Sequence, residues 1–405
     1  MRQGNNMFAI HKNRGVTLVE LMIAMVISTI ILLGVATVYS STKRSYKVQE
    51  EMARLQENAR YAFNSMANDI RGAGFVGCNP KITSLLDETD ANFDPALYDF
   101  QAGVDGWEFT ATGTAPGDDY TITSLTNTGA AANWAGADWD GNGTGDDLAN
   151  VLTGRVLVGN DVLVTKTSDP ASYEDPATCA DGSVLRLQGA NPANATAMTF
   201  NCNTNVEQGQ IVFFGNCSRA DVFQNGATSN SKNLNRNKGV AGSKPGNVNP
   251  ASVNWSQYCE NCQVYKGTGI AYFIGNGAGN EPALFRYDYS KGAAQGIFDE
   301  LVEGVENMQI LYGEDLNAGD DDVQPTQYVT ADNITNPDNV VSIRISLLVR
   351  TPEELNRPQA ANTYRLLGVD NNTGVDITTQ SDRRIRKVFT TTVYMRNKGL
   401  VRERP

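Results

Sequence analysis

The sequence predicts an α+β protein in which one long N-terminal helix is followed by a β-rich head. Three observations lead to this prediction. Residues 16–39 form an almost wholly apolar run, an amphipathic pattern without proline continues from there to Arg71, and apolar and polar residues alternate in the C-terminal third. The 405 residues are enough to bury a sizeable core.

The charge balance argues against several classes of function. The chain has 33 Lys plus Arg against 45 Asp plus Glu, a net charge of −12, which disfavours nucleic acid or an anionic membrane surface as the main partner. The one histidine, His11, lies in the basic segment 1–15. If that segment is removed with its three basic residues, 30 basic residues face 45 acidic ones, a charge of −15. A chain without histidine cannot form a Ser-His-Asp or Cys-His centre or a His-ligated zinc site.

The N-terminus predicts a membrane helix. Residues 1–15 contain three basic residues and no acid, and the apolar run 16–39 follows directly. About 20 apolar residues span a bilayer, and a basic flank favours a cytoplasmic start. A secretory signal peptide fits poorly, because its apolar core is only about 7–15 residues long and needs an A-x-A-like cleavage site. An ordinary uncleaved anchor is the other alternative.

Glu20 is the single charge in the apolar run and argues against both alternatives. An ionisable group at membrane depth is costly and indicates a function. The string RGVTLVELM, residues 14–22, resembles the class III signal of type IV pilins and pseudopilins. The resemblance implies that a prepilin peptidase cuts between Gly15 and Val16 and methylates the new amine of Val16, where the family usually has Phe.

A cut at this place leaves the apolar helix on the protein as a stem for polymerisation. The Glu20 carboxylate can then attract the α-amino group of Val16 in a neighbouring subunit. This attraction is stronger in apolar surroundings than in water, and an unpaired carboxylate there is costly. We therefore expect Glu20 to set the axial register between subunits. The alternative is that Glu20 reaches the membrane interface without a partner.

The stem is predicted to continue beyond the membrane as an amphipathic helix. Its apolar face recurs at spacings of three and four and consists of Val48, Met52, Leu55, Ala59, Ala62, Met66 and Ile70. The sequence RGAG at 71–74 predicts its end.

In the head, strands are predicted at 155–166, 210–214, 270–274, 283–289, 341–347 and 386–395. The alternation in 341–347 is typical of a half-buried strand. A short helix is predicted at 298–305, leading into a strand at 308–312. The tracts 101–150 and 225–255, rich in Gly, Asn and Ser, indicate loops or irregular β-structure.

Four further stretches are similar to the PilW family of type IV pilus minor pilins: DIRGAGFVGC at 69–78, and residues 301–313, 344–351 and 388–397. The resemblance covers the first 78 residues and about 281–400. It implies a pilin-like fold, with a long helix packed on an antiparallel β-sheet head that carries a large β- and loop-rich insertion. The predicted parts are a cleaved leader (1–15), a transmembrane polymerisation helix (16–39), the amphipathic half of the stem (40–75), a variable insertion with cysteines (76–280) and the C-terminal part of the head (281–405).

Six cysteines follow the membrane segment, in a compartment expected to be oxidising: Cys78, Cys179, Cys202, Cys217, Cys259 and Cys262. An even number there predicts disulfides, with fifteen possible pairings. The CxxC formed by Cys259 and Cys262 favours a structural bridge over a redox pair, because a βαβ context is missing from the pattern. Zinc is disfavoured, since neither a second CxxC nor a histidine accompanies it.

The acidic segment 138–147 matches part of an EF-hand loop, whose hard oxygen ligands suit Ca²⁺. The candidate ligands are Asp138, Asp140, Asn142, Thr144 and Asp146. The twelfth position is Ala149 in place of the bidentate Glu, and no helix pattern flanks the loop. An acidic solvated turn is therefore the alternative. Residues 315–322 are a weaker match that we predict not to bind.

The resemblance implies a structural assembly protein and not an enzyme. Its implied role is a minor pilin at or near the pilus tip that primes assembly with other minor pilins, next to the major pilin and a tip adhesin, without direct contact to nucleic acid. It would start as a single-pass inner-membrane protein with a periplasmic head. The alternatives are an adhesive tip module, a minor pseudopilin of type II secretion similar to GspJ, and last a membrane-anchored enzyme, since the sequence shows no nucleophile–base arrangement.

Overall fold

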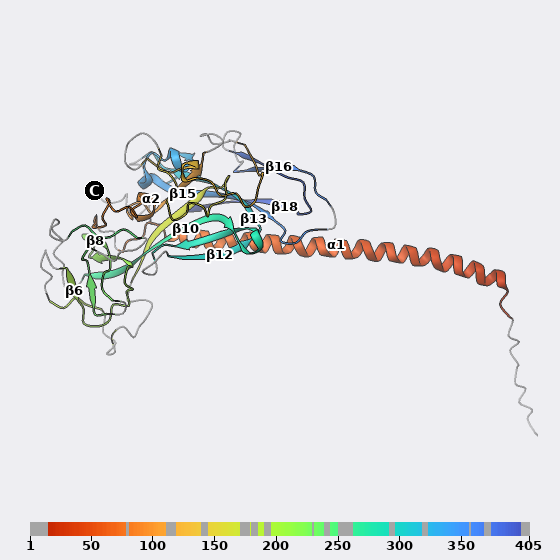
Figure 1. Cartoon of the computed structure of the whole chain (residues 1–405), viewed down its shortest axis with the longest axis horizontal. Coiled ribbons are helices and arrows are strands. Elements are labelled where there is room, and N and C mark those ends of the chain that lie inside the picture. Colours follow the sequence, from red (N-terminus) through yellow and green to blue (C-terminus); the bar gives the residue numbers. More distant parts are fainter. Residues whose placement is uncertain are drawn as a thin grey trace, which may run out of the picture. The chain divides into compact units, whose positions relative to one another are not determined.

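The computed structural model describes residues 15–77, 81–110, 119–138, 145–170, 179, 185–189, 196–228, 231–238, 244–249, 262–290, 296–317, 323–355, 358–367 and 374–397 (Figure 1). The chain divides into two compact units, 1–53 and 54–405. The first unit contains the N-terminal part of helix α1, and the second contains the rest of α1 and the whole β-rich head.

Helix α1 (Leu18–Gly72) is continuous over 55 residues (Figure 1), which confirms the predicted stem. Within the first unit, its apolar residues from Leu18 to Tyr39 are exposed. Among the described residues α1 is the one helix that is long and apolar enough to cross a membrane. A helix with this exposed surface needs lipid or other apolar helices around it.

In the second unit, α1 buries the predicted apolar face. The residues Leu55, Ala59, Ala62, Met66 and Ile70 are each at most 1% exposed and belong to the main hydrophobic core. Two of the five are alanines, which let the helix approach the strands closely. In the first unit Val48 is exposed and Met52 is half-buried, so the buried apolar residues of the predicted face begin at Leu55.

The largest sheet has nine strands. Seven of them run in the order β1-β8-β7-β10-β5-β2-β4, and β11 and β12 extend it from β10. The bounds are β1 (Lys81–Ser84), β2 (Val104–Phe109), β4 (Trp134–Ala135), β5 (Val162–Pro170), β7 (Ile211–Gly215), β8 (Arg219–Gln224), β10 (Gln263–Asn276), β11 (Pro282–Asp288) and β12 (Ile297–Glu303). The long strand β10 pairs with β5, β7 and β11 and so joins the middle of the sequence to its C-terminal third.

The second sheet has the order β14-β13-β15-β18. Its strands are β13 (Val305–Glu314), β14 (Gln327–Val329), β15 (Val340–Arg350) and β18 (Arg386–Tyr394). Two small sheets complete the head, one from β3 (Tyr120–Thr121), β16 (Asn362–Leu366) and β17 (Val375–Thr379), the other from β6 (Ala197–Thr199) and β9 (Asn233–Asn235). The pairs β1–β8 and β3–β17 are parallel, and the other strand pairs of the described residues are antiparallel.

Short helices lie between the strands. They are α2 (Pro95–Tyr98), η1 (Ala131–Asn133), η2 (Ala278–Asn280), η3 (Ala331–Asn333) and η4 (Pro337–Asn339). The side chain of Asp94 caps α2 by accepting a hydrogen bond of 3.1 Å from the backbone N–H of Ala96.

The predicted helix at 298–305 is wrong. Residues 297–303 form the strand β12, Gly304 makes a turn with φ +84°, and β13 begins at Val305. Pairing with β11 decides the conformation, because it places the Phe298 ring against Tyr287 with 4.0 Å between the ring centroids. The spacing of the apolar residues is compatible with a helix, but pairing with β11 stabilises the strand conformation instead.

Two other predictions about strands need correction. The strand predicted at 155–166 begins only at Val162, because residues 151–155 form turns. The strand predicted as half-buried at 341–347 is buried on both faces. One face of β15 contributes to the main core and the other packs with the apolar residues of β16 and β17. The remaining predicted strands are present with ends shifted by at most three residues, except that the strand predicted at 270–274 begins seven residues earlier, at Gln263.

A short polar segment before β5 joins the two large sheets. Strand β14 pairs with residues 312–314 of β13. Asn160 and Asp161 form hydrogen bonds with an earlier part of β13, at Met308 and Ile310. Asn160 Oδ1 accepts the N–H of Met308 at 2.9 Å, and Asp161 Oδ2 accepts that of Ile310 at 2.7 Å. Asp161 Oδ1 also accepts the N–H of Phe109 in β2 at 3.3 Å. These side chains satisfy a buried strand edge, which would otherwise be costly.

Two buried aspartates, Asp105 and Asp161, and the half-buried Asp94 predict that the head loses stability as the pH rises. Burial raises the pKa of Asp94 and Asp161 to about 7 and that of Asp105 to about 6. Between the ordinary value near 4 and these values, the folded state holds protons that the unfolded state has lost. Each group therefore lowers the unfolding free energy by roughly 1.4 kcal/mol per pH unit across that window.

Urea unfolding of the full chain in detergent is expected to give a lower midpoint at pH 8 than at pH 5. Asp90 and Asp382 have lowered pKa values, so they change the unfolding free energy only below about pH 4. They therefore do not affect the comparison between pH 5 and pH 8. In the Asp161→Asn variant one titrating group is removed, and the difference between the two midpoints should shrink. A midpoint that rises from pH 5 to pH 8 would contradict the raised pKa values.

Candidate functional site

The predicted processing and assembly residues lie at the start of α1. Gly15, Val16 and Thr17 precede the helix and are exposed, so the Gly15–Val16 bond lies in non-helical chain. A Cβ added at Gly15 would meet nothing within 4 Å. A peptidase needs an accessible bond outside regular secondary structure, and the Gly15–Val16 bond is exposed and non-helical.

Glu20 forms a reciprocal cap with Thr17. Its Oε2 accepts the backbone N–H of Thr17 at 3.1 Å and the Thr17 hydroxyl at 3.2 Å. The Thr17 Oγ1 in turn accepts the N–H of Glu20 at 3.3 Å. This is a capping box, which satisfies helix donors that otherwise lack a partner, and it places a carboxylate at the positive end of the helix dipole.

Both hydrogen bonds to the Glu20 carboxylate reach the same oxygen, Oε2. Among the described residues no hydrogen bond reaches Oε1, while the apolar neighbours Leu18 and Val19 are 76% and 64% exposed. The carboxylate can therefore close the helix end and still offer one oxygen to a cation from another molecule. The sequence pattern predicted the second of these roles and missed the first.

The end of α1 is fixed by two distant parts of the chain. The carbonyl of Gly72 accepts the Thr167 hydroxyl of β5 at 2.9 Å and the Asn397 side-chain amide at 3.1 Å. The same amide donates to the Ala73 carbonyl at 3.2 Å. Unpaired carbonyls at a helix end need such partners. The stem helix is thereby joined to both the predicted insertion and the C-terminal region.

A balanced cluster of charges joins β13, β15 and β18. Glu306 accepts hydrogen bonds from Arg350 at 2.9 Å and from Arg386 at 2.8 Å. Arg350 also contacts Glu281, which pairs with Arg384 at 2.8 Å. Burial raises the pKa of Glu306, and burial with two neighbouring guanidinium groups lowers that of Arg350 to about 9.

This cluster could not be predicted from the sequence, because its bonded pairs are separated by up to 103 residues, as between Arg384 and Glu281. Asp382 completes it by pairing with Arg386, so three carboxylates face three guanidinium groups. With charges balanced, the arrangement can hold strands together without needing a ligand. We assign it a structural role.

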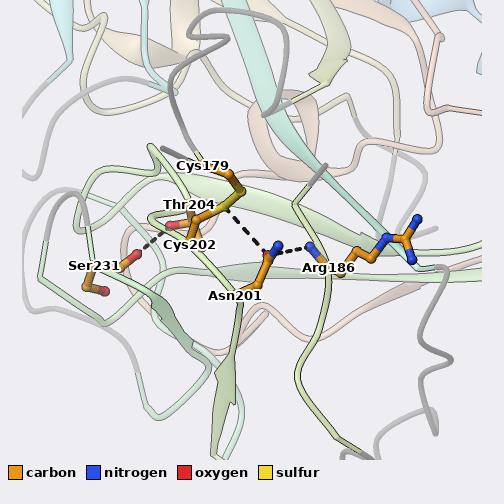
Figure 2. Close-up of a disulfide and its surroundings, with 6 residues drawn as sticks. All are labelled: Cys179, Arg186, Asn201, Cys202, Thr204 and Ser231. Carbon is orange, nitrogen blue, oxygen red and sulfur yellow. Dashed lines mark hydrogen bonds between the residues drawn. A yellow bond between two sulfur atoms is a disulfide. The ribbon is translucent and has the colours of Figure 1, made fainter. Parts of the chain in front are cut away.

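A disulfide joins Cys179 and Cys202, two of the six candidate cysteines (Figure 2), and it closes a sequence separation of 23 residues. Hydrogen bonds fix the surrounding chain: Asn201 Oδ1 accepts the N–H of Arg186 at 2.8 Å, and the Thr204 hydroxyl donates to the Ser231 carbonyl at 3.1 Å. The remaining cysteines divide into Cys217, which is also disulfide-bonded, Cys262, which is buried, and Cys78 and Cys259, which lie outside the described residues.

The predicted calcium ligands are only partly described. Asp138 and Asp146 lie within the described residues, and Asp140, Asn142 and Thr144 lie outside them. Burial raises the pKa of Asp94 and Asp105, and the nearby charge of Asp146 adds to this in both cases. Within the described ranges no group of three His, Cys, Asp or Glu residues is arranged to hold a metal.

Two family models match the chain. Residues 271–397 match the family described as type IV pilus-assembly protein W, and residues 10–36 match the prokaryotic N-terminal methylation motif. The first match begins within β10 and ends just after β18, and the second includes Gly15, Val16 and Glu20. No curated protein and no solved structure matches the chain significantly.

The two matches cover the same regions as the class III signal and the C-terminal stretches, and they confirm both resemblances. Together with the long exposed apolar helix and the β-rich head, they support a membrane-anchored minor pilin of the type IV pilus that is similar to the PilW family over residues 271–397.

Proposed function

We propose that a prepilin peptidase cleaves this chain between Gly15 and Val16 and methylates Val16, and that the mature protein enters the pilus at or near its tip. There it would prime or support filament assembly together with other minor pilins. The observation that carries this proposal is the capped Glu20 in an exposed apolar helix, one turn after an accessible Gly15–Val16 bond.

The geometry supports a specific pairing between subunits. Cleavage creates a positive α-amino group at Val16, and the Glu20 Oε1 of the neighbouring chain can accept it while Oε2 stays bound to Thr17. In apolar surroundings such a pair is strong, and breaking it is costly because one buried charge loses its partner. The pair would fix how far one stem is displaced along the next.

The proposed location and partners follow from the same features. Before assembly, the apolar part of α1 would cross the inner membrane once, with the head in the periplasm. After assembly, the stem would lie among those of other minor pilins and the major pilin, next to a tip adhesin. We propose no direct contact with nucleic acid, since the chain has a net charge of −12. The pseudopilin alternative shares the methylation motif, but the match to pilus-assembly protein W favours the pilus.

Mass spectrometry of the protein from its native membrane tests the processing. We expect a mature chain that begins at Val16 with one added methyl group. A Gly15→Leu variant should retain residues 1–15, because a Cβ and its branch would occupy the site that the peptidase must close on. An unprocessed wild-type chain, or one cut near residue 40, would refute the pilin proposal.

We also propose that the segment 138–146 binds Ca²⁺. Two observations support this: the spacing of its oxygen ligands, and the negative charges of Asp105 and Asp146, which add to burial in raising the pKa of Asp94. A divalent cation would relieve the repulsion between these carboxylates. Millimolar Ca²⁺ is expected to stabilise the head against unfolding, by about 2.7 kcal/mol at a concentration one hundred times the dissociation constant.

The Asp138→Asn/Asp146→Asn double variant should lose this stabilisation, and the exposed Asp119→Asn control should keep it. Thermal unfolding with and without Ca²⁺ measures the effect. Equal shifts in all three proteins, or no shift in the wild type, would remove the calcium proposal and leave the acidic solvated turn.

A further inference from the structure

A polar groove of about 420 Å³ lies at the C-terminal end of α1, the end opposite to its apolar segment. Three parts of the chain form it: the last turn of α1 with the residues after it, the end of β5, and the residues after β18. Its lining includes Asn68, Arg71, Phe75, Thr167, Asp169 and Arg396. We call it the α1-end groove.

The walls of the α1-end groove are held by hydrogen bonds. Besides the Gly72 contacts, the backbone N–H of Ser168 donates to the Phe75 carbonyl at 2.8 Å and its hydroxyl donates to the same oxygen at 3.0 Å. The N–H of Gly74 donates to the Lys166 carbonyl at 2.8 Å. A surface that is already ordered loses little conformational entropy when a partner binds.

The side chains left to meet a partner are mainly two arginines and a phenylalanine. Arg71, Arg396 and Phe75 are exposed, and within the described part of the chain neither arginine forms an ion pair. Asp169 is already engaged, because its Oδ2 accepts the Thr268 hydroxyl at 3.0 Å. Arginine and aromatic residues are enriched in protein interfaces, and guanidinium groups bind carboxylates in a two-pronged geometry.

We propose that the α1-end groove docks an acidic segment of an adjacent pilus subunit. Carboxylates of that segment would bind Arg71 and Arg396, and an apolar side chain beside them would cover Phe75. Charge complementarity selects this partner, since the groove is flanked by two arginines without an ion pair among the described residues, on a chain that has a net charge of −12. The proposal rests on the proposed function, because it assumes that the chain stands in a pilus with neighbours.

The alternative is that Arg71 only stabilises the negative end of the helix dipole, as a basic residue in the last turn of a helix does. That role needs neither Arg396 nor the exposed Phe75 ring. It therefore predicts that reversing both charges weakens the helix end slightly and changes no contact with another subunit.

Photo-crosslinking in the cells that make the pili distinguishes these readings. The photoreactive analogue p-benzoylphenylalanine is placed at position 75 of the full chain, and the crosslinked peptide is sequenced by mass spectrometry. We expect a peptide of another pilus subunit that is rich in Asp and Glu. In the Arg71→Glu/Arg396→Glu variant the adduct should fall at least about tenfold.

The matched control is the Arg186→Glu/Arg219→Glu variant, which reverses two exposed arginines outside the groove and should keep the adduct. The proposal would be overturned by an adduct with a second copy of this chain or with a peptide free of acidic residues. It would also be overturned by an adduct that persists in Arg71→Glu/Arg396→Glu, or by the lack of any adduct in assembled pili. The neutral Arg71→Gln/Arg396→Gln variant tests the same loss without added repulsion. If the chain is unprocessed or absent from pili, the proposed function is wrong. If it is processed and present in pili but gives none of the expected adduct, only the docking proposal is wrong.

Discussion

Replacing Glu20 with alanine is expected to leave cleavage at Gly15 intact and to lower the amount of this chain in pili at least about tenfold. The Val16 amine of the neighbouring subunit would lose its carboxylate partner in apolar surroundings, and breaking a buried ion pair in this way costs about 3–5 kcal/mol. The ratio of the chain in sheared pili to the chain in membranes, measured by immunoblot, gives the effect. Mass spectrometry of the membrane fraction checks that processing is unchanged.

Two further variants separate the charge of Glu20 from its cap. Glu20→Gln keeps a side-chain oxygen that can accept the Thr17 N–H but removes the charge, so it should be as defective as Glu20→Ala. Thr17→Val removes the capping hydroxyl but keeps the carboxylate, and it should cost only about 1 kcal/mol of helix stability. Normal incorporation of Glu20→Gln would show that the cap, and not the ion pair, is what assembly requires.

The stem could be predicted from the sequence because its signals are local. The apolar run, the lack of proline and the spacing of Leu55, Ala59, Ala62, Met66 and Ile70 all lie within one stretch of chain, and α1 starts and ends within two residues of the prediction. The match to the class III signal is local in the same sense. For β12, local spacing gave the wrong answer, since its conformation depends on the pairing with β11.

The contacts that organise the head could not be predicted, because they join residues far apart in sequence. Asn160 and Asp161 meet β13 across about 150 positions, and Asn397 reaches the end of α1 across 325. From the sequence alone, polar residues such as these are indistinguishable from loop residues. Their role becomes visible only when the strand edge or helix end with which they form hydrogen bonds is known. The α1-end groove is built in the same way, so its chemistry is visible only in the folded chain.

Replacing Ala62 with glutamate is expected to prevent the head from folding. Ala62 is fully buried in the main core, where α1 meets the strands. Glutamate is a good helix former, so the helix itself would tolerate the change. The core would have to accept a longer side chain and an unpaired charge, at a cost of about 4 kcal/mol or more, which is a large part of the 5–15 kcal/mol that stabilises a typical domain.

The matched control is Asn64→Glu, two residues along the same helix on its exposed side. Both variants add one negative charge to the same turn of α1, so they differ only in whether the core receives it. Limited proteolysis in native membranes should degrade the Ala62→Glu head and leave the Asn64→Glu head intact. A head that cannot fold also loses the hydrogen bonds at Gly72 that join α1 to β5 and the C-terminal region. The Ala62→Glu chain should therefore be absent from pili, although its Gly15–Val16 bond and Glu20 are unchanged. Proteolytic resistance of Ala62→Glu would mean that α1 does not pack on the strands as described, and assembly would then depend on the first turn of the stem alone.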